Sequence, residues 1–154
     1  MKKMKIIIAS DHAGYHYKNR ILKYLAEKEI NCVDLGTDNG LSVDYPDYAM
    51  KVADTVSKGE IERGVLICGT GIGMSIVANK FSGVRAALCH NVKTAEASRR
   101  HNDANVLVLG ERVLDEEEIL PIVEKWLSTG FDGGHHQQRL DKIREIENSS
   151  DRHS

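Results

Sequence analysis

Cysteine is scarce in this sequence, and its placement argues against two common stabilising devices. The chain has three cysteines, Cys32, Cys68 and Cys89, and none of them forms a C-x-x-C pair. An odd and scattered set disfavours a disulfide framework, and the lack of paired spacings disfavours a structural zinc site. We therefore expect a cytoplasmic location.

Long hydrophobic runs and an excess of one charge are also missing. The apolar run Ile6–Ala9 is too short for the core of a signal peptide, and no stretch approaches the roughly 20 apolar residues of a membrane span. The 21 basic and 23 acidic side chains leave a formal net charge of -2. We therefore expect no general binding of nucleic acid or of membranes, and any anion site must be local.

Short apolar runs alternate with segments of helical periodicity. Five runs are typical of β-strands: Lys5–Ala9, Asn31–Leu35, Gly64–Cys68, Val84–Cys89 and Asn105–Leu109. The helical segments are those around Ile21–Leu25, Ala49–Val56, Ile76–Phe81, Thr94–Arg100 and Ile119–Leu127. Strands without polar alternation, separated by helices, indicate a parallel sheet that is covered on both faces. The 154 residues thus predict a single-domain α/β fold, a doubly wound (Rossmann-like) sheet of five strands.

The C-terminal segment differs from the rest. The segment Phe131–Gly134 ends the globular pattern, and His135–Glu147 predicts a further helix with a narrow apolar stripe of Leu140, Ile143 and Ile146. A thinly apolar helix that follows a complete sheet is expected to reach a partner subunit. The predicted domain therefore covers residues 1–147, and the polar residues 148–154 are expected to form a disordered tail.

The most informative segment joins an apolar run to a glycine-rich turn through Cys68. Gly69, Gly71 and Gly73 let the backbone approach a ligand closely, and the residues after them can start a helix. Amide donors and the positive end of that helix would favour a thiolate at Cys68. A buried cysteine followed by an ordinary tight turn explains this segment equally well when it is taken alone.

Three strand ends bring polar groups to one edge of the predicted sheet. In an open parallel sheet, ligands bind beyond the carboxyl ends of the strands. The first strand is followed by Asp11 and His12, the third ends at Cys68, and Arg112 follows the fifth. Each has an ordinary explanation, since Asp11 can cap a helix and the other charges can lie in solvent. Their convergence at one edge favours a functional site.

A nucleotide site fits these residues poorly. The glycine-rich turn follows the third strand instead of the first, and its Gly-x-Gly-x-Gly spacing lacks the two-residue final gap of the dinucleotide motif. No Gly-Lys-Ser/Thr follows the glycines, which argues against a Walker-type phosphate loop. A smaller phosphate or oxyanion site remains.

Six motifs occur in order along nearly the whole chain. They are Asp11–Gly14 (DHAG), Asp44–Pro46 (DYP), Cys68–Ser75 (CGTGIGMS), Ala78–Lys80 (ANK), Ser98–Asn105 (SRRHNDAN) and Gly133–Arg139 (GGHHQQR). Together they resemble type B ribose-5-phosphate isomerase and its relatives, the galactose-6-phosphate and allose-6-phosphate isomerases. The resemblance implies an isomerase without metal or cofactor that interconverts D-ribose 5-phosphate and D-ribulose 5-phosphate through an enediolate, in the non-oxidative pentose phosphate pathway.

The resemblance also implies roles for individual residues. It implies Cys68 as the base that takes the C2 proton, with Thr70 and the amides from Gly69 to Gly73 stabilising the enediolate. It implies His101, assisted by Asp11, as the acid–base that opens the sugar ring. The substrate-binding residues that it implies are His12, His136 and Arg139 for the phosphate, Arg112 and His135 as further candidates, and Tyr45, Ser75 and Asn102 near the sugar.

One position departs from the family pattern. Many relatives have Gly-Arg-His in the last motif, whereas this chain has Gly134-His135-His136. A permanent cation is thereby replaced by a group that is only partly charged at neutral pH. Phosphate binding is weaker and more pH-dependent if His135 faces the site, and unaffected if it faces solvent.

The chain order predicts an active site shared between subunits. His101 and Asn102 precede the fifth strand and so lie toward the amino edge of the sheet, away from Cys68. If these residues act together, His101 must come from another subunit, which makes a homodimer the simplest arrangement. The resemblance likewise implies homodimers, sometimes paired as tetramers.

Other functions stay open at this level. They are a sugar-phosphate or nucleotide sensor that does not need Cys68, a subunit of a heteromeric hexose-phosphate isomerase, and a thiol redox protein. The lack of a resolving cysteine nearby counts against the redox protein. The sequence does not decide between pentose and hexose phosphates.

Overall fold

A single parallel sheet forms the centre of the molecule, which the computed structural model describes over residues 4–151. Within these residues the strands are β1 (Lys5–Ser10), β2 (Asn31–Asp34), β3 (Arg63–Cys68), β4 (Ala86–Leu88) and β5 (Val106–Gly110). They lie in the order β2-β1-β3-β5-β4, and every neighbouring pair is parallel. The predicted five-stranded α/β sheet is confirmed, and β4 is shorter than its apolar run suggested.

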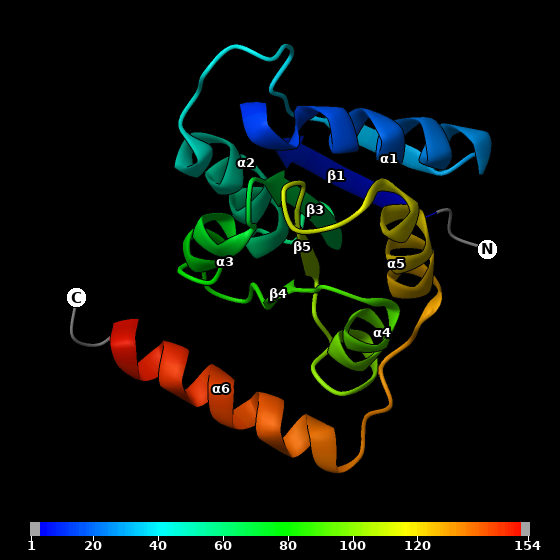
Figure 1. Ribbon diagram of the computed structural model, residues 1–154. Helices are drawn as coiled ribbons and strands as arrows, with labels where there is room; N and C mark the ends of the chain where they lie inside the picture. Colours follow the sequence, from blue (N-terminus) through cyan, green and yellow to red (C-terminus); the bar gives the residue numbers. More distant parts are fainter. Residues whose placement is uncertain (1–3, 152–154) are drawn as a thin grey trace.

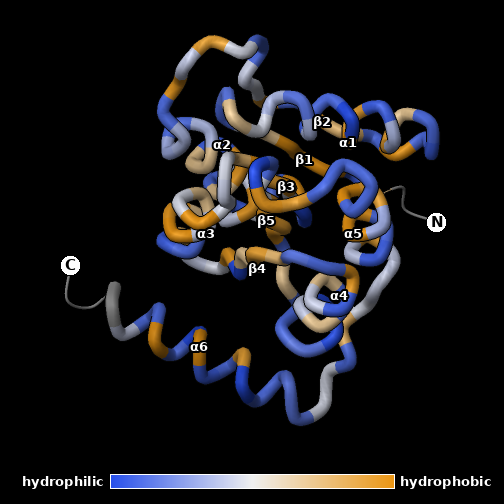
Figure 2. The backbone as a smooth tube through the Cα atoms, in the orientation of Figure 1, coloured by the Kyte–Doolittle hydropathy of each residue, from blue (hydrophilic) through white to orange (hydrophobic). Residues whose placement is uncertain are grey.

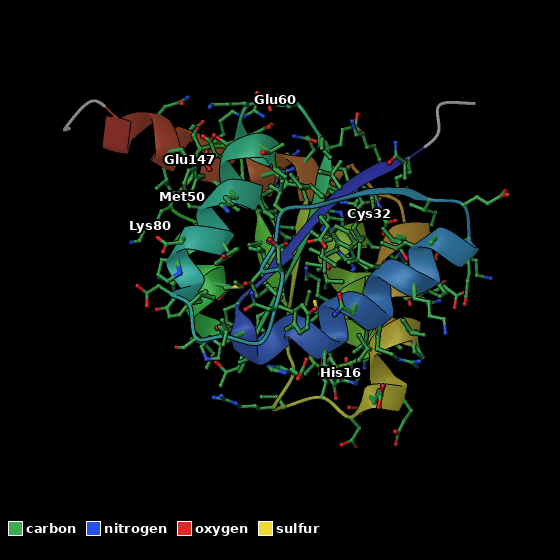
Figure 3. All side chains as sticks on the ribbon, turned by 90° about the horizontal axis from the view of Figure 1, so that it is seen from above. His16, Cys32, Met50, Glu60, Lys80 and Glu147 are labelled. Atoms are coloured by element: carbon green, nitrogen blue, oxygen red, sulfur yellow. The ribbon has the colours of Figure 1, made fainter. Side chains whose placement is uncertain are left out.

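Helices cover both faces of this sheet (Figure 1). They are the short 3-10 helix η1 (His12–Gly14) and the helices α1 (Tyr15–Glu27), α2 (Tyr45–Ser57), α3 (Ile72–Ala78), α4 (Val92–Arg100), α5 (Glu116–Ser128) and α6 (His135–Asp151). The buried residues of α1, α4 and α5 form one core cluster, and those of α2 and α3 form a second. Figure 3 shows β1 running between α1 and α2.

The alternation of side chains along β1 explains why two cores form. Ile6 and Ile8 belong to the cluster under α1 and α5, whereas Ile7 and Ala9 belong to the cluster under α2. Successive side chains of a strand point to opposite faces, so a continuous apolar run supplies both layers. In Figure 2 the central strands are coloured mostly hydrophobic, whereas much of the surrounding chain, including most of α6, is coloured hydrophilic.

The two cysteines outside the glycine turn and the single tryptophan have structural positions. Trp126 is fully buried on α5, and the guanidinium of Arg63 lies 5.4 Å from its ring centre. Cys89 is also buried, as expected for a core residue. Cys32 is only half-buried, because β2 is the edge strand next to β1. Burial, followed by the charge of Asp34, raises the pKa of the Cys32 thiol to about 12.

Two helices differ from their predicted limits. We expected the helix after the glycine turn to start in the stretch Met74–Lys80 and to continue through Ile76–Phe81, but α3 begins at Ile72 and ends at Ala78. It starts early because Gly71, with a φ of 84°, turns the chain directly into the first helical residue. Helix α6 continues to Asp151, beyond the predicted end at Glu147, since no glycine or proline follows Gly134 to stop it. Residues 152–154 of the predicted disordered tail lie outside the described residues.

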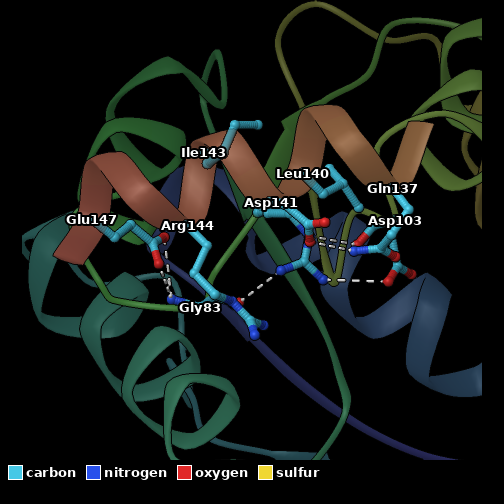
Figure 4. A pocket seen from close by; sticks show the side chains of 9 residues that line it. Gly83, Asp103, Gln137, Leu140, Asp141, Ile143, Arg144 and Glu147 are labelled. Carbon is cyan, nitrogen blue, oxygen red and sulfur yellow. Dashed lines mark hydrogen bonds and ion pairs between the residues drawn. The ribbon is translucent and has the colours of Figure 1, made fainter. Parts of the chain in front are cut away.

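Helix α6 stands apart from the layers of the sheet (Figure 1). The backbone N–H of Gly83 donates to both carboxylate oxygens of Glu147 at 3.2 Å, and a groove lined by Arg85 and Leu140 separates the helix from the body (Figure 4). Ile146 is 66% exposed. The apolar stripe of α6 is therefore largely unused within its own chain. None of the helices in the described residues is long and apolar enough to cross a membrane.

Candidate active site

The carboxyl ends of β1, β3 and β5 lie side by side because these strands are neighbours in the sheet. Cys68 at the end of β3 pairs in register with Gly110 at the end of β5. The loops that follow are tied together, since the N–H of Glu111 donates to the carbonyl of Cys68 and that of Arg112 to the carbonyl of Gly69, both at 2.9 Å. The predicted convergence of strand-end residues is therefore present.

Cys68 lies at the base of the glycine turn. Its side chain is 5% exposed, and its Sγ accepts a hydrogen bond from the backbone N–H of Gly71 at 3.1 Å. An amide donor aimed at sulfur stabilises the anionic form of a thiol. Gly71 is needed for this geometry, because a methyl group added there would lie 2.5 Å from Cδ1 of Leu88.

Thr70 and Ser75 use their hydroxyl groups differently. The Oγ1 of exposed Thr70 accepts from the N–H of Ile72 at 3.2 Å, so its own hydrogen remains available to a ligand. The hydroxyl of Ser75 donates to the carbonyl of Ile72 at 2.8 Å within α3. Ser75 can therefore only accept a hydrogen bond from a ligand in this arrangement.

Tyr45 and Arg112 approach the glycine turn from two sides. A methyl group added at Gly73 would lie 2.5 Å from the Tyr45 ring, so this ring packs directly on the first turn of α3. A methyl group added at Gly69 would lie 3.1 Å from Nη1 of Arg112. The Tyr45 ring leaves no room for a larger residue at Gly73, whereas at Gly69 the contact is with the flexible end of Arg112.

Asp11 and His12 follow β1 and lie beside the same edge. Asp11 is 6% exposed and caps η1, accepting from the N–H of Gly14 at 3.1 Å, so its ordinary structural role is present. The Nδ1 of His12 accepts from the N–H of Val43 at 3.1 Å. This bond holds the loop before α2 over the edge and places the proton of a neutral His12 ring on Nε2.

A second group of residues forms at the opposite, amino edge of the sheet. Helix α4 leads from the end of β4 back to His101, which caps its C-terminus before β5 begins. The His101 ring stacks on that of His136 with centres 4.6 Å apart, and the His135 ring lies 4.0 Å from His136. Partial removal from water and the positive charges of His135, His101 and Arg139 lower the pKa of His136.

The predicted site residues thus fall into two groups within one chain. The carboxyl-edge group consists of Asp11, His12, Tyr45, Cys68, Gly69, Thr70, Gly71, Gly73, Ser75 and Arg112. The amino-edge group consists of His101, Asn102, His135, His136 and Arg139. The sheet lies between them, so a single chain does not bring His101 to Cys68 or to Asp11.

Sequence reasoning missed Asp132, which faces the amino-edge group. Its carboxylate lies within 4.8 Å of ring nitrogens of His101 and His136. The approach of Asp132 to His101 joins residues that are far apart in the sequence. This arrangement depends on the turn at Gly133 and Gly134, which have φ values of 70° and 58°. The glycine pair after Asp132 was the only signal in the sequence.

Comparisons with known proteins agree with this geometry. The sequence matches the Ribose/Galactose Isomerase family over residues 6–143. It is 46% identical over 143 residues to ribose-5-phosphate isomerase B of Escherichia coli (strain K12), covering 93% of this chain and 96% of that protein.

Solved structures show the same likeness. Ribose-5-phosphate isomerase B of Clostridium thermocellum has a TM-score of 0.94 and 51% identity, covering 96% of this chain and 99% of its own. The Mycoplasma genitalium protein of the same name, with ribulose 5-phosphate bound, has a TM-score of 0.91 and 45% identity, covering 96% and 99%.

Proposed function

The chain belongs to the ribose/galactose isomerase family, and on that premise we propose that it interconverts D-ribose 5-phosphate and D-ribulose 5-phosphate with Cys68 as its base. The observation that carries this proposal is the thiol of Cys68, held at a strand end with the Gly71 amide aimed at its sulfur. The name of the E. coli relative and the ligand of the Mycoplasma structure support the choice of substrate. The reaction is an intramolecular oxidoreduction, so it consumes no external oxidant or reductant.

The carboxyl-edge group suits the proton transfer. The thiolate of Cys68 takes the proton from C2 of the open-chain aldose, and negative charge develops on the carbonyl oxygen O1. The hydroxyl proton passes from O2 to O1 within the enediolate, and Cys68 then returns its proton to C1. The amides of Gly71 and Ile72 already donate to Cys68 and Thr70. The amides of Gly69 and Gly73 and the free hydroxyl hydrogen of Thr70 are therefore the donors that stabilise this enediolate. Tyr45, packed on the same turn, contacts the sugar.

The amino-edge group supplies the ring-opening and phosphate-binding side chains that the carboxyl-edge group lacks. His101 acts as the acid–base that opens the furanose ring, and His136 and Arg139 bind the phosphate. Because the sheet separates them from Cys68 in one chain, the active site combines the carboxyl-edge group of one subunit with the amino-edge group of another. The simplest assembly is a homodimer, in which Asp11 of one chain assists His101 of the other.

Exposed apolar side chains support this assembly. Ile72 and Ile76 on α3 are 53% and 57% exposed beside the thiol site, and Ile143 and Ile146 are exposed on α6. Isolated exposed apolar residues are ordinary, but here they border both halves of the divided site. We propose that α6 reaches the partner subunit. A working thiol also requires a reducing compartment, which supports a cytoplasmic location.

The first test is a panel of aldose phosphates incubated with the purified protein and scored for ketose formation. We expect ribose 5-phosphate to be isomerised, and galactose 6-phosphate and allose 6-phosphate to react more slowly. Cys68→Ser should reduce turnover by about two to four orders of magnitude while substrate binding is largely kept. The matched control is Cys32→Ser, which alters a half-buried thiol outside the site. Near-normal turnover in Cys68→Ser would exclude the proposed base.

The second test concerns His101. His101→Asn should slow the reaction of ribose 5-phosphate, which is mostly cyclic, far more than the reaction of its 4-deoxy analogue, an open aldehyde that cannot close a furanose ring, because only the cyclic form needs ring opening. Single-turnover kinetics with both compounds measure the difference. An equal loss with the open aldehyde would show that His101 is not chiefly a ring opener.

A further inference from the structure

The amino-edge group contains an arrangement that proton transfer in an isomerase does not need. His101, Asp132 and His136 each offer one ligand atom, and these atoms all lie within 4.8 Å of one another. Among the described residues, no other set of three histidine, cysteine or acidic side chains is placed in this way. We propose that these three side chains bind a divalent transition-metal ion of the zinc class, and that the bound ion inhibits the enzyme.

The donor set suits such an ion. Two imidazoles and one carboxylate are a recurring set for Zn²⁺ in which water or another ligand completes the coordination. Zn–N bonds of about 2.0–2.1 Å put neighbouring ligand atoms of a tetrahedron about 3.3 Å apart. The three side chains must therefore approach one another by up to about 1.5 Å from the observed limit of 4.8 Å. His101 and Asp132 are exposed, so side-chain rotation can achieve this.

The backbone already holds the three residues together. The N–H of Asp132 donates to the carbonyl of Arg100 at 3.0 Å, which fixes Asp132 beside the end of α4. The backbone N–H of His101 donates to the carbonyl of Ala97 at 2.9 Å in the last turn of that helix. The backbone N–H of His136 donates to the carbonyl of Gly133 at 3.1 Å. Binding an ion therefore orders side chains and not the chain itself, which limits its entropic cost.

Nearby cations oppose the ion without preventing its binding. Nε of Arg100 lies 3.1 Å from Oδ2 of Asp132 and 3.4 Å from Oδ1, in a pair whose side chains are 49% and 38% exposed. Exposed ion pairs of this kind are weak. Oδ1 can turn to the metal while Arg100 keeps Oδ2, and such an outer partner orients a ligating carboxylate. Arg139, one helical turn after His136, also lowers the affinity by its charge.

Inhibition of the enzyme by the bound ion rests on the proposed function, whereas binding of the ion does not. An ion held by His101 and His136 occupies the nitrogens that would open the ring and contact the phosphate. The mechanism proposed above does not require zinc, so the bound ion acts only as a reversible inhibitor. Substrate and inorganic phosphate should compete with the ion, because they need the same imidazoles.

The binding test is calorimetric titration of the intact protein with ZnCl₂. His101→Asn and Asp132→Asn should each weaken binding by about tenfold or more, since loss of merely an outer partner of a metal ligand costs 10–100-fold. His90→Asn removes an exposed histidine elsewhere and should leave the affinity unchanged. Cys68→Ser should also bind zinc normally. Unchanged affinity in Asp132→Asn and His101→Asn, or loss of binding in Cys68→Ser, would overturn the proposed site.

The activity test separates the metal site from the proposed function. Measured against its own turnover without zinc, Asp132→Asn should resist zinc inhibition, while the wild type loses turnover as zinc is added and recovers it with a chelator. If zinc binds through these residues and turnover is unaffected, the inhibitory role is wrong. If zinc does not bind and His101→Asn is still slow, the metal site is wrong and the proposed function stands.

Discussion

In the proposed phosphate site, the charge of His136 adds to that of Arg139 in attracting an anion to the amino edge. Partial removal from water and the charges of His135, His101 and Arg139 lower its pKa, and Asp132 only partly opposes them. A histidine with a lowered pKa is mostly neutral at pH 7 and becomes charged only as the pH falls below the ordinary value of about 6.5. Binding of a phosphate dianion should therefore strengthen on acidification, until the phosphate itself is protonated near about pH 6.

The departure from the family pattern at His135 can be tested in the same pH range. His135→Arg should lower KM most above about pH 7, because arginine keeps its charge where a histidine has lost it. The measurement is KM for ribose 5-phosphate from about pH 6 to about pH 9, with His90→Arg as the control for a cation added on another segment. A KM that matches the wild type at every pH would place His135 in solvent.

Sequence reasoning worked best where residues act through their near neighbours. The position of Cys68 at a glycine turn could be predicted because its strand, its glycines and the amide that reaches its sulfur lie in the continuous segment Arg63–Gly73. The stacked rings of His101 and His136 could not be foreseen as a contact. It depends on where α5 ends and on two glycines with left-handed backbone conformations, and periodicity predicts neither.

The turn before α3 depends on one glycine, Gly71, and this turn determines where the helix begins. Gly71→Ala should lower the free energy of unfolding by about 1–3 kcal/mol, because a φ of 84° strains any other residue and the new methyl would meet Leu88. Turnover should fall as well, since the amide that donates to Cys68 would shift. Urea unfolding and steady-state kinetics measure the two effects.

The matched control for this substitution is Gly40→Ala. An added methyl group at Gly40 would meet no atom within 4 Å, and its backbone is not left-handed. We expect little change in stability or turnover there. If the two variants behave alike, the strained turn is not what positions the sulfur.

The limits of α3 and α6 show why helix ends are harder to predict than helices. Apolar spacing marks the buried face of a helix, but α3 has only two buried residues, Met74 and Ala78, to reveal its period. Helix α6 has no stop signal after Gly134 and is mostly polar, so neither of its ends is marked by a change in hydropathy. Strands buried on both faces were easier to predict, because each appears in the sequence as a continuous apolar run.

The division of the site between two edges makes a prediction for the whole assembly. If the proposed shared site is right, Cys68→Ser and His101→Asn chains should each be inactive as pure dimers, whereas a mixed dimer should contain one intact site. After the two variants are unfolded together and refolded, half of randomly formed dimers are mixed. Activity should then return to about one quarter of the wild-type value. Sedimentation tests for the expected dimer, and activity no higher than that of the separate variants would exclude shared sites.

The burial of Trp126 has a spectroscopic consequence. It is the only tryptophan in the sequence, and it is enclosed in the core between α5 and the sheet. Its fluorescence therefore reports on the interior of one subunit. Separation of two intact subunits would leave this emission nearly unchanged, whereas unfolding exposes the indole to water and shifts the emission to longer wavelength. A sample that loses activity on dilution but keeps its emission spectrum has dissociated without unfolding.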